Sequence, residues 1–165
     1  MDDLFSYRLK LLQKEMEMLQ NGIRGYDSII FTIKGWSITV FSAIVIFAVD
    51  KQKPFLYWLC FASLLSFWLI DAFYKSIQNN MISRYRKIEI FLQSSDFEAA
   101  IAERSFGNFR VPNFNEELSV RRSQRLRWLL QAALQFYTYS LYTFLLGLTI
   151  FAKIITSGWN CSRMP

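Results

Sequence analysis

Residues 29–49 read IIFTIKGWSITVFSAIVIFAV, residues 55–70 read FLYWLCFASLLSFWLI, and only the short segment DKQKP separates these two apolar runs. A third apolar run covers residues 129–155. A membrane-spanning helix needs about 20 mostly apolar residues. The first and third runs reach that length directly, and the second reaches it when it continues through Tyr74. The sequence therefore predicts an all-α integral membrane protein with three transmembrane helices.

The composition agrees with this prediction. Hydrophobic residues make up 53% of the 165 residues, and aromatic residues make up 18%. Aromatic side chains are frequent where helices cross the membrane–water interface. A soluble helical bundle can be equally apolar, but three such long runs leave too little polar surface to cover them.

The distribution of basic residues predicts the orientation. Lysines and arginines are frequent up to Lys34 and again between Lys75 and Arg127, and positive charge favours the cytoplasmic side. We therefore expect a membrane protein with a cytoplasmic N-terminus and an external C-terminus. Its expected parts are a cytoplasmic amphipathic helix (1–28), a transmembrane hairpin (29–75), a basic cytoplasmic helical segment (76–127), a third transmembrane helix (128–156) and an external tail (157–165).

The first helix should run without interruption over residues 3–48, with long cytoplasmic extensions of both helices of the hairpin. Apolar residues near its start recur at alternating spacings of four and three, which is the pattern of paired helices. This stripe either packs on the chain's own cytoplasmic helices or pairs with another copy. The residues we assign to this cytoplasmic association are Phe5, Leu9, Leu12, Met16 and Leu19.

Two shorter helices are expected after the hairpin. Ser95 and Glu98 fit a capping box that opens a helix over residues 96–104. Asn115 can cap a further helix that carries an arginine cluster and continues directly into the third span.

Lys34 and Asp71 are the charged residues at membrane depth in the hairpin. Because the turn is short, the two residues should lie at similar depth, about one turn inside the cytoplasmic face. Ionisable groups at such depth usually pair or face a cavity. One alternative is structural: the two residues form an ion pair, or Lys34 simply extends toward the interface. The other is a gate or relay whose pairing changes when the protein is triggered.

Gly35, Thr39 and Ala43 form a stripe of small residues at four-residue spacing. Such stripes let membrane helices approach closely. The stripe serves packing either within one monomer or between protomers of a homo-oligomer.

The arginine cluster before the third span comprises Arg121, Arg122, Arg125 and Arg127. A basic cluster beside a span typically contacts anionic lipid headgroups, and it could also bind phosphates. Nothing in the pattern reads bases, so sequence-specific nucleic-acid binding is not expected.

Catalysis is not expected. The chain has no histidine, which is the commonest general base and metal ligand. It has no glycine-rich phosphate loop, and its two cysteines cannot form a zinc site. We therefore predict no catalytic residues, no metal and no cofactor.

Two stretches, FTIKGWSITV (31–40) and FWLIDAFY (67–74), resemble the spans of small bacterial membrane proteins. That group is similar to the two-transmembrane, SLATT-like effectors associated with anti-phage systems of the retron, cyclic-oligonucleotide and CRISPR accessory types. The resemblance covers residues 26–90, and the third span departs from the two-span pattern. It implies an effector that stays silent until infection and then damages the inner membrane.

Two functional hypotheses follow. The first is a homo-oligomeric inner-membrane effector that permeabilises or depolarises the membrane in anti-phage defence by abortive infection. It would contact membrane lipid and could be restrained by a soluble partner from the same operon. The alternative is a non-enzymatic membrane anchor or adaptor whose cytoplasmic helices dock a soluble partner.

Overall fold

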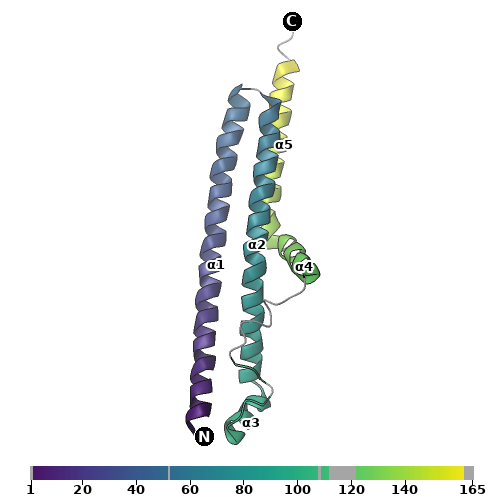
Figure 1. Cartoon of the computed structure of the whole chain (residues 1–165). Coiled ribbons are helices and arrows are strands. Elements are labelled where there is room, and N and C mark those ends of the chain that lie inside the picture. Colours follow the sequence, from purple (N-terminus) through teal and green to yellow (C-terminus); the bar gives the residue numbers. More distant parts are fainter. Residues whose placement is uncertain (1, 52, 108, 112–121, 162–165) are drawn as a thin grey trace. The chain divides into compact units, whose positions relative to one another are not determined.

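The computed structural model describes residues 2–51, 53–107, 109–111 and 122–161, and within these ranges it contains helices, turns and loops but no strand. Side chains are described for residues 4–51, 53, 55–107, 109–111 and 126–155. The helices are α1 (Asp2–Lys51), α2 (Pro54–Leu92), α3 (Ser95–Glu103), α4 (Arg122–Ala133) and α5 (Phe136–Cys161) (Figure 1).

Three helical segments are long and apolar enough to cross a membrane: Leu4–Lys51, Phe55–Leu92 and Phe136–Ile155. The prediction of an all-helical chain with three candidate spans is confirmed at this level. The first helix is continuous from Asp2 to Lys51, as its sequence pattern predicts.

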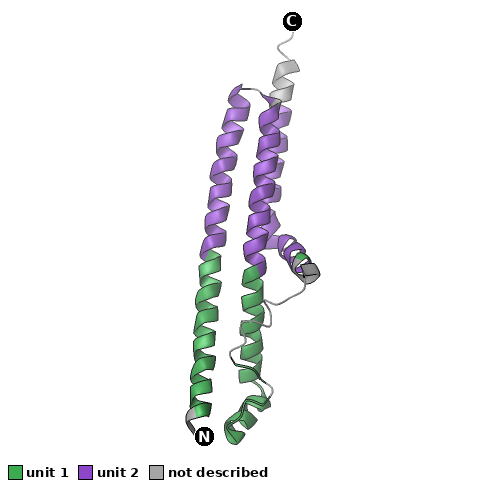
Figure 2. Ribbon diagram, viewed as in Figure 1, with its two compact units in different colours: residues 1–27, 77–126 green, residues 28–76, 127–165 purple. Residues whose placement is uncertain are grey.

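The chain forms two compact units, which Figure 2 distinguishes by colour. Unit 1 comprises residues 1–27 and 77–126, and unit 2 comprises residues 28–76 and 127–165. Helices α1 and α2 contribute to both units, so each unit contains an antiparallel pair of helical segments. We describe each unit by itself.

The core of unit 1 forms between α1, α2 and α3. Its buried members include Leu12 and Leu19 from α1, and Ile88 from α2, which is fully buried. The loop after α3 closes this core, because the Phe109 ring stacks on Phe91 at a centroid distance of 3.9 Å. Apolar burial of this kind contributes roughly 25 cal/mol per Å² and explains why the polar loop is held on the helices.

The start of α3 differs from the capping box that we expected on Ser95. Ser94 is the N-cap residue, and its side chain makes no capping hydrogen bond. Its hydroxyl instead donates to the carbonyl of Phe91, at 2.7 Å. The serine is thus used to close the last turn of α2, which competes with capping the helix that follows.

The core of unit 2 forms between α1, α2 and α5. Phe41, Leu64, Tyr142 and Leu145 are its buried members. Many large apolar side chains of the same helices face outward, and Phe55 is 72% exposed. Exposed apolar surface on this scale is unusual for a soluble protein and suits helices surrounded by lipid.

The expected continuous helix through the third span is wrong at Leu134–Gln135. Helix α4 ends at Ala133 and α5 begins at Phe136. The carbonyl of Gln135 accepts hydrogen bonds from the amides of Thr138 and Tyr139, at 2.8 and 3.2 Å. The candidate span is consequently Phe136–Ile155 and does not begin near residue 128.

A side chain from α2 stabilises the end of α4. The indole Nε1 of Trp68 donates to the carbonyl of Ala133, at 3.2 Å. The last carbonyls of a helix lack partners within that helix. The indole supplies one, which explains how the helix can stop inside an apolar run without glycine or proline.

Candidate functional site

A buried carboxylate lies within unit 2, near the end of its α2 segment. Asp71 on α2 is 1% exposed, next to the fully buried Ala72. A charge removed from water in this way is costly unless it is paired and hydrogen-bonded. Its partners therefore decide what the site can do.

The structure brings Lys34 and Asp71 together, as the depth argument predicts. The Nζ atom of Lys34 lies 3.8 Å from Oδ2 of Asp71. The same Nζ donates to the carbonyl of Tyr137 at only 2.6 Å, and the Lys34 side chain is 25% exposed. Lys34 therefore links α1 to the first turn of α5 more tightly than it binds the carboxylate.

Tyr142 on α5 is a member of this site that the sequence reasoning missed. Its hydroxyl lies 3.3 Å from Oδ2 of Asp71 and 3.4 Å from the carbonyl oxygen of Phe67. Buried Ser37 donates from its hydroxyl to the carbonyl of Lys34, at 2.8 Å. A tyrosine in a span presents a polar tip on an apolar ring, but its spacing alone does not identify its partner.

The second carboxylate oxygen of Asp71 is the least satisfied polar atom of the site. Oδ1 is buried and has no hydrogen-bond donor among the described residues. An ionised carboxylate offers about four acceptor positions. Here one oxygen receives a long hydrogen bond and a distant ammonium, and the other receives nothing. The arrangement can therefore gain or release a charge, or change its pairing, at little cost in broken contacts.

The small-residue stripe lies on an outward face of α1. Gly35, Thr39 and Ala43 are all exposed, and no heavy atom outside the local helix backbone lies within 4 Å of a Cβ built at Gly35. The Thr39 hydroxyl donates to the Gly35 carbonyl at 3.0 Å. The stripe therefore serves no close packing within unit 2, and packing between protomers stays a prediction.

The stripe assigned to cytoplasmic association lies mostly inside unit 1. Leu12 and Leu19 are buried in its core, with Phe5 and Met16 packed against them, whereas Leu9 is 38% exposed. The first alternative, packing on the chain's own helices, is what the structure shows. Pairing with a second copy through this stripe stays a prediction.

Unit 1 contains a second buried ion pair, which the sequence reasoning did not identify. Arg84 donates from Nε to Oε1 of Glu15 at 2.8 Å and from Nη2 to Oε2 at 3.2 Å. The same guanidinium donates to the carbonyl of Arg110 at 3.0 Å and lies 5.3 Å from the Phe109 ring centroid. This bidentate pair stabilises the loop after α3.

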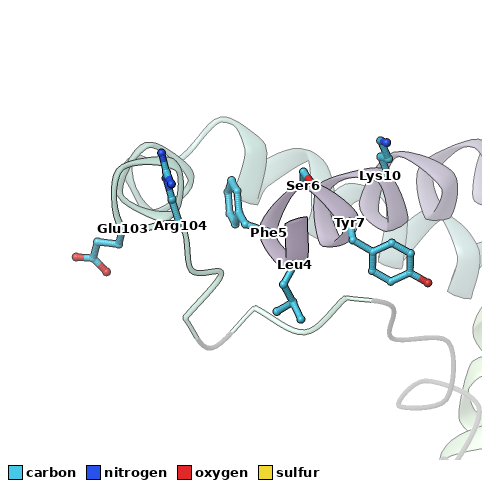
Figure 3. A pocket seen from close by; sticks show the side chains of 7 residues that line it. All are labelled: Leu4, Phe5, Ser6, Tyr7, Lys10, Glu103 and Arg104. Atoms are coloured by element: carbon cyan, nitrogen blue, oxygen red, sulfur yellow. The ribbon is translucent and has the colours of Figure 1, made fainter. Parts of the chain in front are cut away.

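A wide groove of about 950 Å³ opens at the end of unit 1, between the first turns of α1 and the end of α3 (Figure 3). Phe5 points toward the segment that carries Glu103 and Arg104, whereas Tyr7 and Lys10 lie further along α1. The ring of Phe5 stacks on Phe106 at 5.2 Å. The groove combines apolar and charged walls.

The arginine cluster is largely outside the described residues. Arg121 is not described, and the side chains of Arg122 and Arg125 are not described either. Arg127 is exposed. Contact of this cluster with lipid or phosphate stays a prediction.

Among the described residues, no three or more acidic or cysteine side chains lie close enough together to hold a metal ion. No protein-family model, no curated protein and no solved structure matches the chain.

Proposed function

We propose that this chain is a homo-oligomeric inner-membrane effector that permeabilises or depolarises the membrane, and that the Lys34–Asp71 pair controls it. The proposal rests on the position of Asp71. Its carboxylate is buried on a candidate span, and one of its oxygens has no hydrogen-bond donor among the described residues. Ionisable residues inside transmembrane segments are costly and usually mark ion pathways or gates.

The loose geometry of the pair supports a controlling role over a purely structural one. A buried pair contributes to stability only when its geometry is close and its remaining polar atoms are satisfied. This pair is 3.8 Å long, and Oδ1 of Asp71 has no hydrogen-bond donor among the described residues, so it meets neither condition. This geometry suits a change of pairing better than a stabilising contact.

The exposed small stripe supports assembly from several copies. Three candidate spans are few for a conducting path within one chain, and a Cβ built at Gly35 would meet no described atom within 4 Å outside the local helix. Helices in membranes approach closely at small residues. Copies that associate along Gly35, Thr39 and Ala43 would bring several α1 helices around a shared path.

The resemblance of residues 26–90 to SLATT-like effectors supports a role in anti-phage defence. In such a role the effector is silent until infection. Membrane lipid is its direct partner, and a soluble protein from the same operon is a candidate regulator.

The test is membrane potential in bacteria that express the full chain. We expect depolarisation by the wild-type chain, and an altered rate or extent with Asp71→Asn. Asp50→Asn is the matched control, because Asp50 is the exposed aspartate of the turn, with 63% of its side chain accessible. Unchanged potential with all three proteins, at equal membrane abundance, would refute the proposal.

A membrane anchor or adaptor is the second candidate, and the groove at the end of unit 1 favours it. In that case expression is harmless, and Asp71→Asn has no effect on the membrane. Substitution of the exposed Tyr7 in the full chain would instead abolish the recruitment of a soluble partner.

A further inference from the structure

The groups around Asp71 are compatible with both an ionised carboxylate and a protonated carboxyl group. Oδ2 faces the hydroxyl of Tyr142 at 3.3 Å, and that hydroxyl also faces the Phe67 carbonyl at 3.4 Å. A tyrosine hydroxyl has one proton and can donate to only one of these acceptors at a time. When it donates to Phe67, the carboxylate of Asp71 keeps only the Lys34 ammonium at 3.8 Å, whereas a protonated carboxyl group could itself donate to the Tyr142 oxygen.

We infer that Asp71 is a proton-binding site, and that its protonation at the buried carboxyl group releases Lys34 and triggers the membrane activity. The inference rests on the proposed function for its second half only. The step is the transfer of a proton from hydronium in the adjacent aqueous phase to the carboxylate, which yields a neutral carboxylic acid and water. No other reactant is required.

The neighbouring charges favour a proton over a metal cation. Lys34 from α1 lies 3.8 Å from Oδ2, and Lys75 from α2 adds a second positive charge that acts on Asp71. Tyr142 is the titratable group from α5. Two cations repel a bound metal ion and, to a lesser extent, a proton, but burial of the carboxylate favours the neutral acid, whose proton can be shared with the Tyr142 oxygen.

Lys34 is positioned to tolerate the loss of its counter-ion. Its ammonium keeps the Tyr137 carbonyl at 2.6 Å, and its side chain is 25% exposed. Protonation therefore removes the attraction between α1 and α2 at this depth without leaving Lys34 unsatisfied. The contact of Lys34 with α5 is kept, and the groups that change are Asp71 and its hydrogen-bond partner Tyr142.

The first readout is the infrared spectrum of the full chain in lipid vesicles, recorded between about pH 5 and pH 8, the range in which a biological pH signal would act. We expect a carbonyl band of a protonated acid that rises as the pH falls and is missing in Asp71→Asn. The control Asp50→Asn keeps the band. A wild-type spectrum without such a band, or a band that survives in Asp71→Asn, would overturn the inference.

A second variant guards against misfolding of Asp71→Asn. Tyr142→Phe keeps the carboxyl group and removes one hydrogen-bond partner. The acid band should then move to higher frequency, because a carbonyl with fewer hydrogen bonds is stiffer. A band at the wild-type frequency would show that Tyr142 does not contact the acid and would overturn the geometry.

Potassium release from the same vesicles separates this inference from the proposed function. We expect release by the wild type to rise about tenfold per unit fall in pH above the midpoint, because the protonated fraction rises by that factor. Release by Asp71→Asn should be independent of pH. A titrating band without any release refutes the proposed function and leaves the proton site standing. Release without a titrating band refutes the proton site alone.

Discussion

Each unit of the molecule buries one ion pair, and the two pairs are built differently. In unit 1, Arg84 binds Glu15 through two hydrogen bonds of 2.8 and 3.2 Å and adds a third to a backbone carbonyl. In unit 2, Lys34 lies 3.8 Å from Asp71, and one oxygen of Asp71 has no donor among the described residues. The first pair has the geometry of a fixed structural contact. The second has the geometry of a group that can change its charge or its partner.

The two basic residues explain the difference in geometry. Arginine presents a rigid fork that matches a carboxylate, whereas lysine is a compact charge on a flexible stem. Unit 1 uses the arginine to hold the loop after α3 on its core. Unit 2 uses the lysine, whose contacts can be redistributed.

We expect the largest loss of stability when the ion pair of unit 1 is broken. Glu15→Ala leaves the buried guanidinium of Arg84 without its counter-ion, which should lower the opening free energy of unit 1 by about 3–5 kcal/mol. Hydrogen exchange of the α2 amides around Ile88 measures this. Glu17→Ala is the control: Glu17 forms an exposed pair with Lys14, and its loss should cost about 0–1 kcal/mol. Equal effects of the two substitutions would contradict the structural role of Glu15.

We expect a smaller loss of stability when either acid is neutralised by a substitution that keeps the shape of its side chain. Glu15→Gln removes charge-assisted hydrogen bonds in unit 1 and should cost about 1.5–3 kcal/mol. Asp71→Asn should cost less than Glu15→Gln, because its ion pair is long and Lys34 keeps another acceptor. Unfolding of both variants in one detergent gives the comparison. A larger loss with Asp71→Asn would show that the looser pair is the structural one.

We expect the smallest change in stability from alanine substitution of two glycines of α1, one in each unit. A Cβ at Gly22 would lie 2.9 Å from Sδ of Met81, so Met81 has to move, whereas no atom outside the local helix lies within 4 Å at Gly35. Gly35→Ala should therefore gain nearly the full helix-propensity difference of about 1 kcal/mol, and Gly22→Ala should gain less. Thermal unfolding of the monomer in detergent tests this.

The same two variants sharpen the role of the small stripe. If protomers pack along Gly35, Gly35→Ala should reduce the oligomer in the membrane although it stabilises the monomer. Gly22→Ala should leave the oligomer unchanged. Chemical crosslinking in vesicles measures both, and an unchanged oligomer with Gly35→Ala would remove this stripe from the interface.

The sequence predicts the helices and one of the two ion pairs because both follow from local rules. Long apolar runs fix the candidate spans, and the short turn fixes the relative depth of Lys34 and Asp71. The stripe of Leu12 and Leu19 shows its helical period clearly, although the period alone does not decide which helix it meets.

The remaining features depend on how helices rotate and where a loop lies. Tyr142 reaches Asp71 only because α5 turns that face toward α2. Glu15 and Arg84 are far apart in the sequence and resemble ordinary surface charges until the loop after α3 covers them. At the helix break near Gln135, Trp68 donates a hydrogen bond to the carbonyl of Ala133, and no local pattern reveals this contact.

The most direct test of the central claim is potassium release from vesicles that contain only the purified chain and lipid. Wild type should release potassium, and Asp50→Asn should release it at the wild-type rate. Asp71→Asn, whose side chain is neutral like the protonated acid, should raise the rate at neutral pH about tenfold, which corresponds to about 1.4 kcal/mol at the controlling site. Release that is absent with all three proteins, or identical in all three, would contradict a membrane effector controlled by Asp71.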